Sequence, residues 1–231
     1  MRTTIGWRFL GEAPYRPAWD LQRALARAVE QDETTAGFLV LLTHPPTFTT
    51  GRRDSGRFFN ADRETLEKMG FAVVATDRGG FVTYHGPGQL VGYPILALSR
   101  LGVAGVADYV DRLQRLMIGV CASYGVTAQA REEFPGVWAG EDKIGAIGIR
   151  IAHGVATHGF ALNVAPRLED YRFITACGLS GRGVTSLARL GVETTVEEAA
   201  RRVVSQAETV FDAAFVERDL RAAAAPHVEA P

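Results

Sequence analysis

The order of helix-type and strand-type segments is what most restricts the fold of this chain. The spacing of apolar residues predicts helices at 17–30, 62–69, 106–124 and from Thr195 onward. Apolar and β-branched runs predict strands at 37–43, 71–76, 81–84, 90–96, 137–139, 143–151 and 155–164, with a loop at 44–53 and a turn at 153–154. Several strands follow one another without an intervening helix, so the strict alternation of a doubly wound sheet is absent. The pattern predicts an α+β fold with a mixed, largely antiparallel sheet flanked by helices.

The chain is expected to form one domain. It has 231 residues, of which 47% are hydrophobic and 22% charged, and no repeat, linker or shift in composition divides it. We assign residues 1–217 to a single domain, which is large enough to be catalytic. Residues 218–231 are rich in alanine and proline, which predicts a disordered tail.

Charge and residue spacing exclude several function classes. The formal net charge of −1 argues against a general nucleic-acid binder. The sequence has neither an apolar run long enough to span a membrane nor a secretory h-region, so we expect a cytoplasmic protein that does not bind membranes. Its histidines and cysteines lack the spacing of metal ligands, so we expect no metal.

Two cysteines have different surroundings. Cys177 lies in the stretch Ala-Cys-Gly-Leu-Ser-Gly-Arg-Gly183, whose glycines let the backbone approach a ligand and could present N–H groups to an oxyanion. Cys121 falls on the apolar face of the helix predicted at 106–124, which indicates a core residue. The loop sequence alone leaves two readings of Cys177 open, a nucleophile and a member of an ordinary glycine turn.

Lys143 precedes the small, apolar run Ile-Gly-Ala-Ile-Gly-Ile149. At the edge of a sheet it would be a solvated lysine. In a central strand it would be partly desolvated and could act as a base for a thiol.

The segment 78–89 gathers glycines around polar side chains. It has no phosphate-binding loop pattern, so we predict a shaped wall for an apolar ligand, with Tyr84 and His85 as orienting polar groups. His158 is either a second such group or a satisfied core histidine. Four arginines form a further cluster, namely Arg52, Arg53, Arg57 and Arg78. This cluster is either part of a solvated loop or a docking surface for an acidic protein.

Four segments together resemble the lipoyl(octanoyl) transferase family. They are Arg78-Gly-Gly-Phe-Val-Thr-Tyr-His-Gly-Pro-Gly-Gln-Leu-Val-Gly-Tyr-Pro94, Lys143-Ile-Gly-Ala-Ile-Gly-Ile-Arg150, His158-Gly-Phe-Ala-Leu-Asn-Val164 and Ala176-Cys-Gly-Leu-Ser-Gly-Arg-Gly-Val-Thr-Ser186. The resemblance extends from about residue 38 to residue 187. Ala176, where the family often has proline, and Leu179, where isoleucine is commoner, depart from the pattern.

The resemblance implies a fold similar to the catalytic domain of biotin and lipoate protein ligases. It also implies a Cys/Lys acyltransferase with Cys177 as nucleophile and Lys143 as base. The residues that it implies for the acyl and carrier-arm site are Arg78, Gly79, Gly80, Tyr84, His85, Gly86, Gly145, Ala146, His158, Gly159 and Ala161.

The implied reaction transfers an octanoyl group from the phosphopantetheine arm of acyl carrier protein, through a Cys177 thioester, to a lysine of a lipoyl domain. The acceptors would be the lipoyl domains of 2-oxoacid dehydrogenase complexes and the glycine cleavage H protein, and the enzyme would need no cofactor of its own. Ping-pong kinetics follow from such an intermediate.

Two alternatives stay open at this point. One is an ATP-dependent lipoate or biotin protein ligase on the same fold, which would activate a free acid and need no cysteine. The other is a non-catalytic protein that binds acyl groups or lipoyl domains.

Overall fold

The computed structural model describes residues 3–53, 58–132, 135–175 and 183–224. Its centre is an eight-stranded sheet in the order β11-β1-β2-β6-β10-β9-β8-β7. The strands are β1 (Thr3–Glu12), β2 (Gly37–Thr43), β6 (Gln89–Ala97), β7 (Gln129–Ala130), β8 (Val137–Ala139), β9 (Asp142–Ala152), β10 (Val155–Asn163) and β11 (Ala213–Glu217). β1 is parallel to β11 and to β2, and the other neighbouring pairs are antiparallel. The predicted α+β class with a mixed, largely antiparallel sheet is confirmed.

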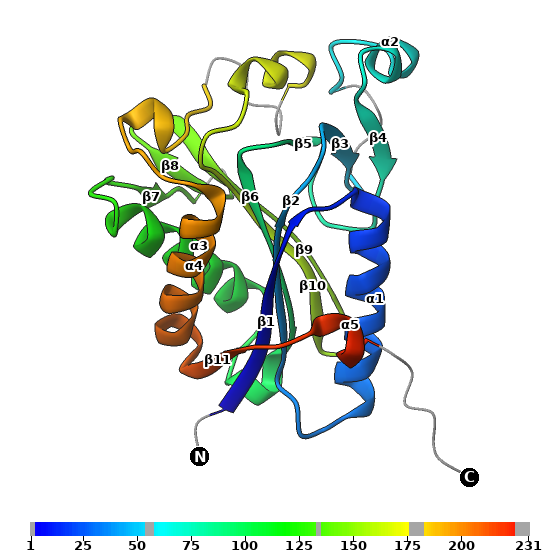
Figure 1. Cartoon of the computed structure of the whole chain (residues 1–231), viewed down its shortest axis with the longest axis vertical. Helices are drawn as coiled ribbons and strands as arrows, with labels where there is room; N and C mark the ends of the chain where they lie inside the picture. Colours follow the sequence, from blue (N-terminus) through cyan, green and yellow to red (C-terminus); the bar gives the residue numbers. More distant parts are fainter. Residues whose placement is uncertain (1–2, 54–57, 133–134, 176–182, 225–231) are drawn as a thin grey trace.

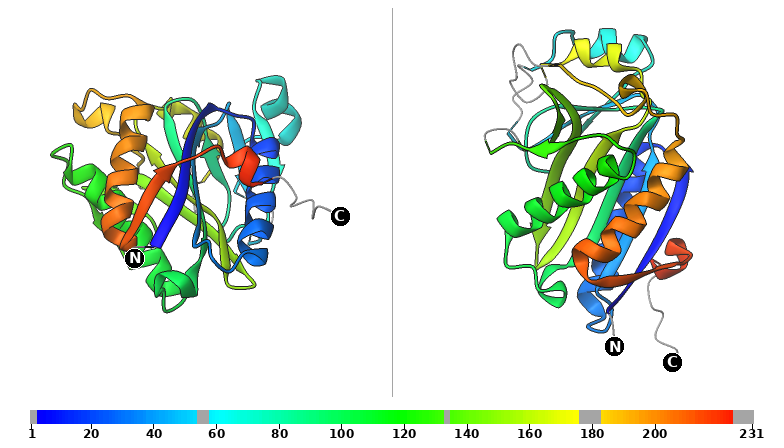
Figure 2. Two further views of the ribbon diagram at one scale, coloured as in Figure 1. Left: turned by 60° about the horizontal axis from the view of Figure 1, so that its bottom comes forward. Right: turned by 90° about the vertical axis from the view of Figure 1, so that its left-hand side faces the viewer.

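Helices cover both faces of this sheet. α1 (Tyr15–Gln31) and the short α5 (Leu220–Ala223) lie on one face, and α3 (Val106–Ala122) and α4 (Val196–Phe211) lie side by side on the other (Figures 1 and 2). The sheet residues alternate accordingly. Leu90, Leu162 and Ile144 pack in the core beneath α3 and α4, whereas Val91 and Ala161 pack beneath α1.

A smaller sheet lies at the end of the molecule away from the two termini (Figure 1). It has the order β4-β3-β5, formed by β3 (Thr47–Thr50), β4 (Ala72–Ala75) and β5 (Thr83–His85), and α2 (Arg63–Lys68) packs beside it. Phe48, Phe71 and Tyr84 form part of its own core. The two sheets enclose the space in which the site lies.

Local sequence signals located several elements correctly. β2 has the predicted bounds, and the turn at His153 and Gly154 has positive φ at both residues, 49° and 76°, as a two-residue hairpin turn requires. α4 begins with the predicted capping box, in which Thr195 Oγ1 accepts from the Glu198 N–H and the Glu198 carboxylate accepts from the Thr195 N–H.

Three expectations about the ends of elements were wrong. The loop expected at 44–53 contains β3, and β1 was not predicted. The helix expected from Thr195 onward ends at Phe211, Asp212 follows in the left-handed conformation, and Ala213–Glu217 form β11 instead of continuing the helix. The disordered tail cannot start at residue 218, because Leu220 of α5 is buried against the α1 side of the sheet.

Candidate active site

A pocket lies between the α1-covered face of the main sheet and the small sheet. β9 and β10 supply one wall, the segment that ends in β5 supplies the opposite wall, and α1 and β6 supply the remainder. The lining side chains are mostly apolar or small, which suits an acyl chain. They belong to Tyr15, Arg78, Gly80, Phe81, Val82, Thr83, His85, Val91, Tyr93, Lys143, Ala146, Ile147, Gly148, His158, Gly159, Phe160 and Ala161.

Lys143 is buried in this wall, with 7% of its surface exposed. Because β9 lies between β8 and β10, the edge-strand reading of Lys143 is wrong. Its Nζ lies 5.6 Å from the centroid of the Trp138 ring. Gly136 makes room for it, since a Cβ there would lie 2.5 Å from the Lys143 Cε.

A β-bulge aims the lysine into the pocket. The pairing of β8 with β9 shifts by one residue between Val137–Gly145 and Trp138–Lys143. Gly145 and Ile144 both face α3, and Lys143 then faces the pocket together with Ala146. Regular alternation from Ala146 would have turned Lys143 toward the helices, so the bulge redirects the side chain.

Cys177 lies outside the described residues, but the chain on either side of its segment is held close to the pocket. Before it, the Thr175 N–H donates to the Phe58 carbonyl over 2.8 Å. After it, the Lys143 N–H donates to the Gly183 carbonyl, and the Thr185 N–H donates to the Lys143 carbonyl, both over 3.0 Å. The described chain on both sides of the Cys177 segment is therefore anchored, to Phe58 before it and to Lys143 after it.

His85 faces the pocket in a fixed tautomer. The side-chain N–H groups of Gln89 point to the Asn163 Oδ1, the Tyr171 hydroxyl and the Tyr84 carbonyl, which leaves Gln89 Oε1 to accept from His85 Nδ1 over 2.8 Å. Burial lowers the pKa of His85 well below its ordinary value, so the ring is neutral and Nε2 carries a lone pair.

The predicted role of Tyr84 in the pocket is not borne out by its position. Its ring lies in the core of the small sheet against Phe48, and its hydroxyl donates to Asp170 Oδ2 over 2.8 Å. Neighbouring side chains of a strand point to opposite faces, so His85 reaches the pocket and Tyr84 does not. Gly86 lies against the Tyr84 hydroxyl rather than in the lining.

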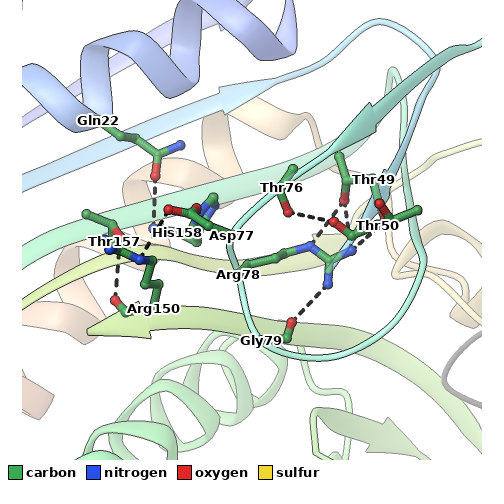
Figure 3. A network of polar contacts seen from close by, with 10 residues as sticks. All are labelled: Gln22, Thr49, Thr50, Thr76, Asp77, Arg78, Gly79, Arg150, Thr157 and His158. Carbon is green, nitrogen blue, oxygen red and sulfur yellow. Dashed lines mark hydrogen bonds and ion pairs between the residues drawn. The ribbon is translucent and has the colours of Figure 1, made fainter. Parts of the chain in front are cut away.

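Arg78 holds the segment between β4 and β5 in place. Its guanidinium donates to the Thr49 carbonyl over 2.6 Å and to the Gly79 carbonyl over 3.0 Å (Figure 3). The Gly79 N–H donates to the Ile149 carbonyl of β9. The exposed Arg52 and Arg53 bind the outer side of the same segment through their backbone N–H groups, which donate to the Arg78 and Gly80 carbonyls. Arg57 lies outside the described residues.

Of the other predicted residues, Gly80, Ala146, His158, Gly159 and Ala161 line the pocket. Gly145 lines a small adjoining hollow together with Lys143, Asn163 and Tyr171. His158 donates from Nε2 to Asp77 Oδ1 over 2.7 Å. Burial lowers its pKa, so the ring is neutral.

The sequence did not reveal a group of buried aromatic residues at the pocket. Tyr15 of α1 and Tyr93 of β6 line it, and the Tyr93 hydroxyl lies 2.7 Å from His44 Nε2. Burial raises the pKa of Tyr15 to about 12, raises that of Tyr93 well above its ordinary value and lowers that of His44 to about 4, so all three are neutral near pH 7. They come from three distant segments, and no spacing in the chain connects them.

The described residues contain no group of three or more histidine, cysteine, aspartate and glutamate side chains placed to hold a metal ion. No helix in this part of the chain is long and apolar enough to cross a membrane.

Comparison with known proteins agrees with this geometry. The family model "Lipoyl protein ligase A/B catalytic domain" matches residues 14–208. An octanoyltransferase of Chloroflexus aggregans is 44% identical over 216 residues, which cover 92% of this chain and 96% of the relative. An octanoyltransferase of Solibacter usitatus is 42% identical over 205 residues, with 89% and 92% covered.

Two solved structures are similar in fold. One is the putative lipoate protein ligase Ta0514 from T. acidophilum with bound lipoic acid, with a TM-score of 0.74 at 15% identity. The other is lipoate-protein ligase A bound with ATP, with a TM-score of 0.74 at 14% identity. Each comparison covers 97% of this chain and 93% of the other. The expected likeness to lipoate ligases is confirmed at the level of fold, and by its family match and its relatives the chain belongs to the lipoyl protein ligase A/B catalytic domain family.

Proposed function

We propose that this protein is an octanoyltransferase that moves an octanoyl group from acyl carrier protein to a lysine of a lipoyl domain. The observation that carries the proposal is Lys143, a buried lysine in the wall of an apolar pocket. Its backbone is hydrogen-bonded to the chain that leads out of the Cys177 segment. The octanoyltransferase relatives, 42% to 44% identical over most of the chain, support the same reaction.

In the first half-reaction Cys177 gives its proton to the Lys143 amine. The thiolate attacks the carbonyl carbon of the octanoyl thioester, and a carbon–sulfur bond to Cys177 forms while the bond to the carrier sulfur breaks. The departing phosphopantetheine thiolate then accepts this proton from the Lys143 ammonium. Because one thioester replaces another, the step needs no ATP and no cofactor belonging to the enzyme.

In the second half-reaction the acceptor lysine loses one proton to water and attacks the acyl-enzyme as a neutral amine. A carbon–nitrogen bond forms, one amine proton passes to Lys143, and the carbon–sulfur bond to Cys177 breaks. The cysteine sulfur recovers the proton from Lys143. The acceptors we propose are the lipoyl domains of 2-oxoacid dehydrogenase complexes and the glycine cleavage H protein, in the cytoplasm, where the thiol stays reduced.

A ligase reaction is the less favoured alternative. The solved lipoate ligases share the fold with this chain at only 14% to 15% identity, whereas the octanoyltransferases share 42% to 44%. A ligase would also give the proposed nucleophile Cys177 no role.

Intact-mass measurement of the wild-type protein tests the proposed function. After incubation with octanoyl carrier protein we expect one added octanoyl group that hydroxylamine removes. Addition of an apo lipoyl domain should discharge it and octanoylate the domain. Octanoylation of the domain without a labile adduct would contradict the thioester route. Transfer that required ATP and free octanoate would favour the ligase.

The exposed Arg52 and Arg53 give a further prediction. Both flank the outer side of the segment that forms one pocket wall, where an acidic carrier protein would dock. We expect Arg52→Glu/Arg53→Glu to raise KM for octanoyl carrier protein about tenfold or more at low salt, and to leave kcat/KM for octanoyl-pantetheine unchanged. The matched control reverses the charge of Arg201 on α4, which lies on the opposite side of the main sheet. An equal loss with both donors would refute the docking role.

A further inference from the structure

His158 has an unusual backbone for a residue inside a strand. Its φ is 57°, a value that residues other than glycine seldom adopt. By the register of β10 with β6 it lies opposite Pro94, which has no N–H to donate to the ladder. The His158 N–H donates instead to Gln22 Oε1 of α1 over 2.9 Å (Figure 3). Such strain at a pocket residue points to a function for its side chain.

The contacts of the His158 ring fix its tautomer. Nε2 lies 2.7 Å from Asp77 Oδ1, and Asp77 also pairs with Arg150 Nε over 3.2 Å (Figure 3). A carboxylate held by an arginine accepts hydrogen bonds, so Nε2 carries the proton. Nδ1 is therefore an acceptor. It is buried and receives no hydrogen bond from any residue that the structure describes.

Gln22 presents the complementary group. Its Oε1 is occupied by the His158 N–H, which fixes the orientation of the amide. The amide nitrogen, Nε2, is a donor, and it too is buried without an acceptor among the described residues. Gln22 is 0% exposed and His158 is 1% exposed. Buried polar groups are rarely left unpaired, so an unpaired donor on Gln22 and an unpaired acceptor on His158, whose backbone N–H contacts Gln22, indicate a ligand.

His158 lines the pocket at its end remote from Lys143, and Gln22 contacts the backbone N–H of His158. His158 pairs with Ile149 of β9, six residues along the strand from Lys143, which corresponds to about 20 Å. Tyr93 and Trp19 pack around the His158 ring. An acyl chain bound to a thiol near Lys143 would therefore extend toward Gln22 and His158.

We propose that Gln22 and His158 form a binding site for a single hydroxyl group at the inner end of the pocket. A hydroxyl oxygen can accept from the Gln22 amide and donate to His158 Nδ1 at the same time. The hydroxyl comes either from a trapped water or from the distal end of a hydroxylated acyl chain. The inference rests on the proposed function, because the acyl chain defines which end of the pocket is the inner one.

Each source has a distinct consequence for substrate choice. A trapped water limits chain length, because a chain that expels it leaves both polar groups unpaired, at a cost of about tenfold or more in kcat/KM. A substrate hydroxyl removes that cost. An apolar pocket would reject a hydroxylated chain, whereas a site built for a hydroxyl accepts it.

The test compares plain and ω-hydroxylated acyl-pantetheine thioesters from octanoyl to hexadecanoyl, so that the longest chains can reach the site from a thiol near Lys143. The wild-type protein, Gln22→Met and the control Ile147→Leu are each measured by kcat/KM. Ile147 lines the same pocket and has no polar atom in its side chain. Circular dichroism checks that the variants are folded, and the wild-type series is informative without them.

If the substrate supplies the hydroxyl, the wild type should use a hydroxylated chain of one length at least as well as the plain chain. Gln22→Met should lower that ratio about tenfold or more. If water supplies it, hydroxylated chains should be poor at every length. The wild type should then show a sharp upper limit for plain chains that Gln22→Met relaxes and Ile147→Leu does not.

The inference is overturned if the ratio and the length limit are the same in Gln22→Met as in the wild type. Failure of the proposed function is a different result, namely no transfer of the plain octanoyl group by the wild type. It would overturn this inference as well, because no acyl chain would then enter the pocket.

Discussion

Replacement of Cys177 by serine is expected to abolish the labile octanoyl adduct and to lower kcat/KM for transfer by about a thousandfold or more. A cysteine thiol has an ordinary pKa of about 8.5 and loses its proton to an amine readily, whereas a serine hydroxyl does not. An ester formed on serine would also be a poorer acyl donor to the acceptor amine. Intact mass and a lipoyl-domain gel-shift or mass assay measure both effects.

Cys121 supplies the matched control. Its thiol is free and 0% exposed, on the face of α3 that packs in the core, and burial raises its pKa to about 12. It is therefore protonated and out of reach of a carrier arm. Cys121→Ala should keep the adduct and most of the transfer rate. An adduct retained in Cys177→Ser and lost in Cys121→Ala would refute the assignment of the nucleophile.

Replacement of Lys143 by methionine is expected to lower both half-reactions by about a hundredfold to ten-thousandfold while the protein stays folded. Methionine keeps an apolar side chain of similar length beside Trp138. The backbone hydrogen bonds to Gly183 and Thr185 do not depend on the side chain. The loss should therefore reflect the missing base rather than a rearranged pocket.

The dependence of the acylation rate on pH distinguishes the loss of the base from a rearranged pocket. Without the lysine, the rate of adduct formation should rise with pH, because the thiol must then ionise without the help of a base. A pocket that had merely collapsed would stay slow at every pH. Lys68→Met, which changes an exposed lysine of α2, is the control. Wild-type rates in Lys143→Met would remove the lysine from the mechanism.

The sequence was sufficient where a structural choice is local. The capping box at Thr195 and the turn at His153 and Gly154 need only neighbouring residues, and both were predicted correctly. β1 and β11 depend on pairing between the two ends of the chain, Thr3 with Ala213, so no short window contains their signal. The burial of Leu220 likewise depends on docking rather than on the composition of the tail.

The candidate site likewise has features that one stretch of sequence predicts and features that depend on distant residues. The glycine-rich segment at 78–89 was predicted as a pocket wall because it lies in one stretch of chain, whereas Ala146 in the strand after Lys143 was implied by the family resemblance. The positions of Tyr84 and His85 were not separable, since adjacent strand residues differ in face and only the pairing of β5 decides which one turns inward. The left-handed backbone of His158 has no signal in its own sequence, because Pro94 and Gln22 impose it from other elements.

The bulge at Ile144 determines which face of the sheet the Lys143 side chain points to. Ile144 and Gly145 are neighbours in β9 and both face α3, whereas regular pleating would turn neighbouring residues to opposite faces. A redesign that idealised β9 at constant length would restore strict alternation and turn the amine of Lys143 into the apolar core. A β9 strand of unchanged length can either be regular or turn Lys143 toward the pocket, but it cannot do both. An irregularity that a designer would remove is thus what the proposed role of Lys143 requires.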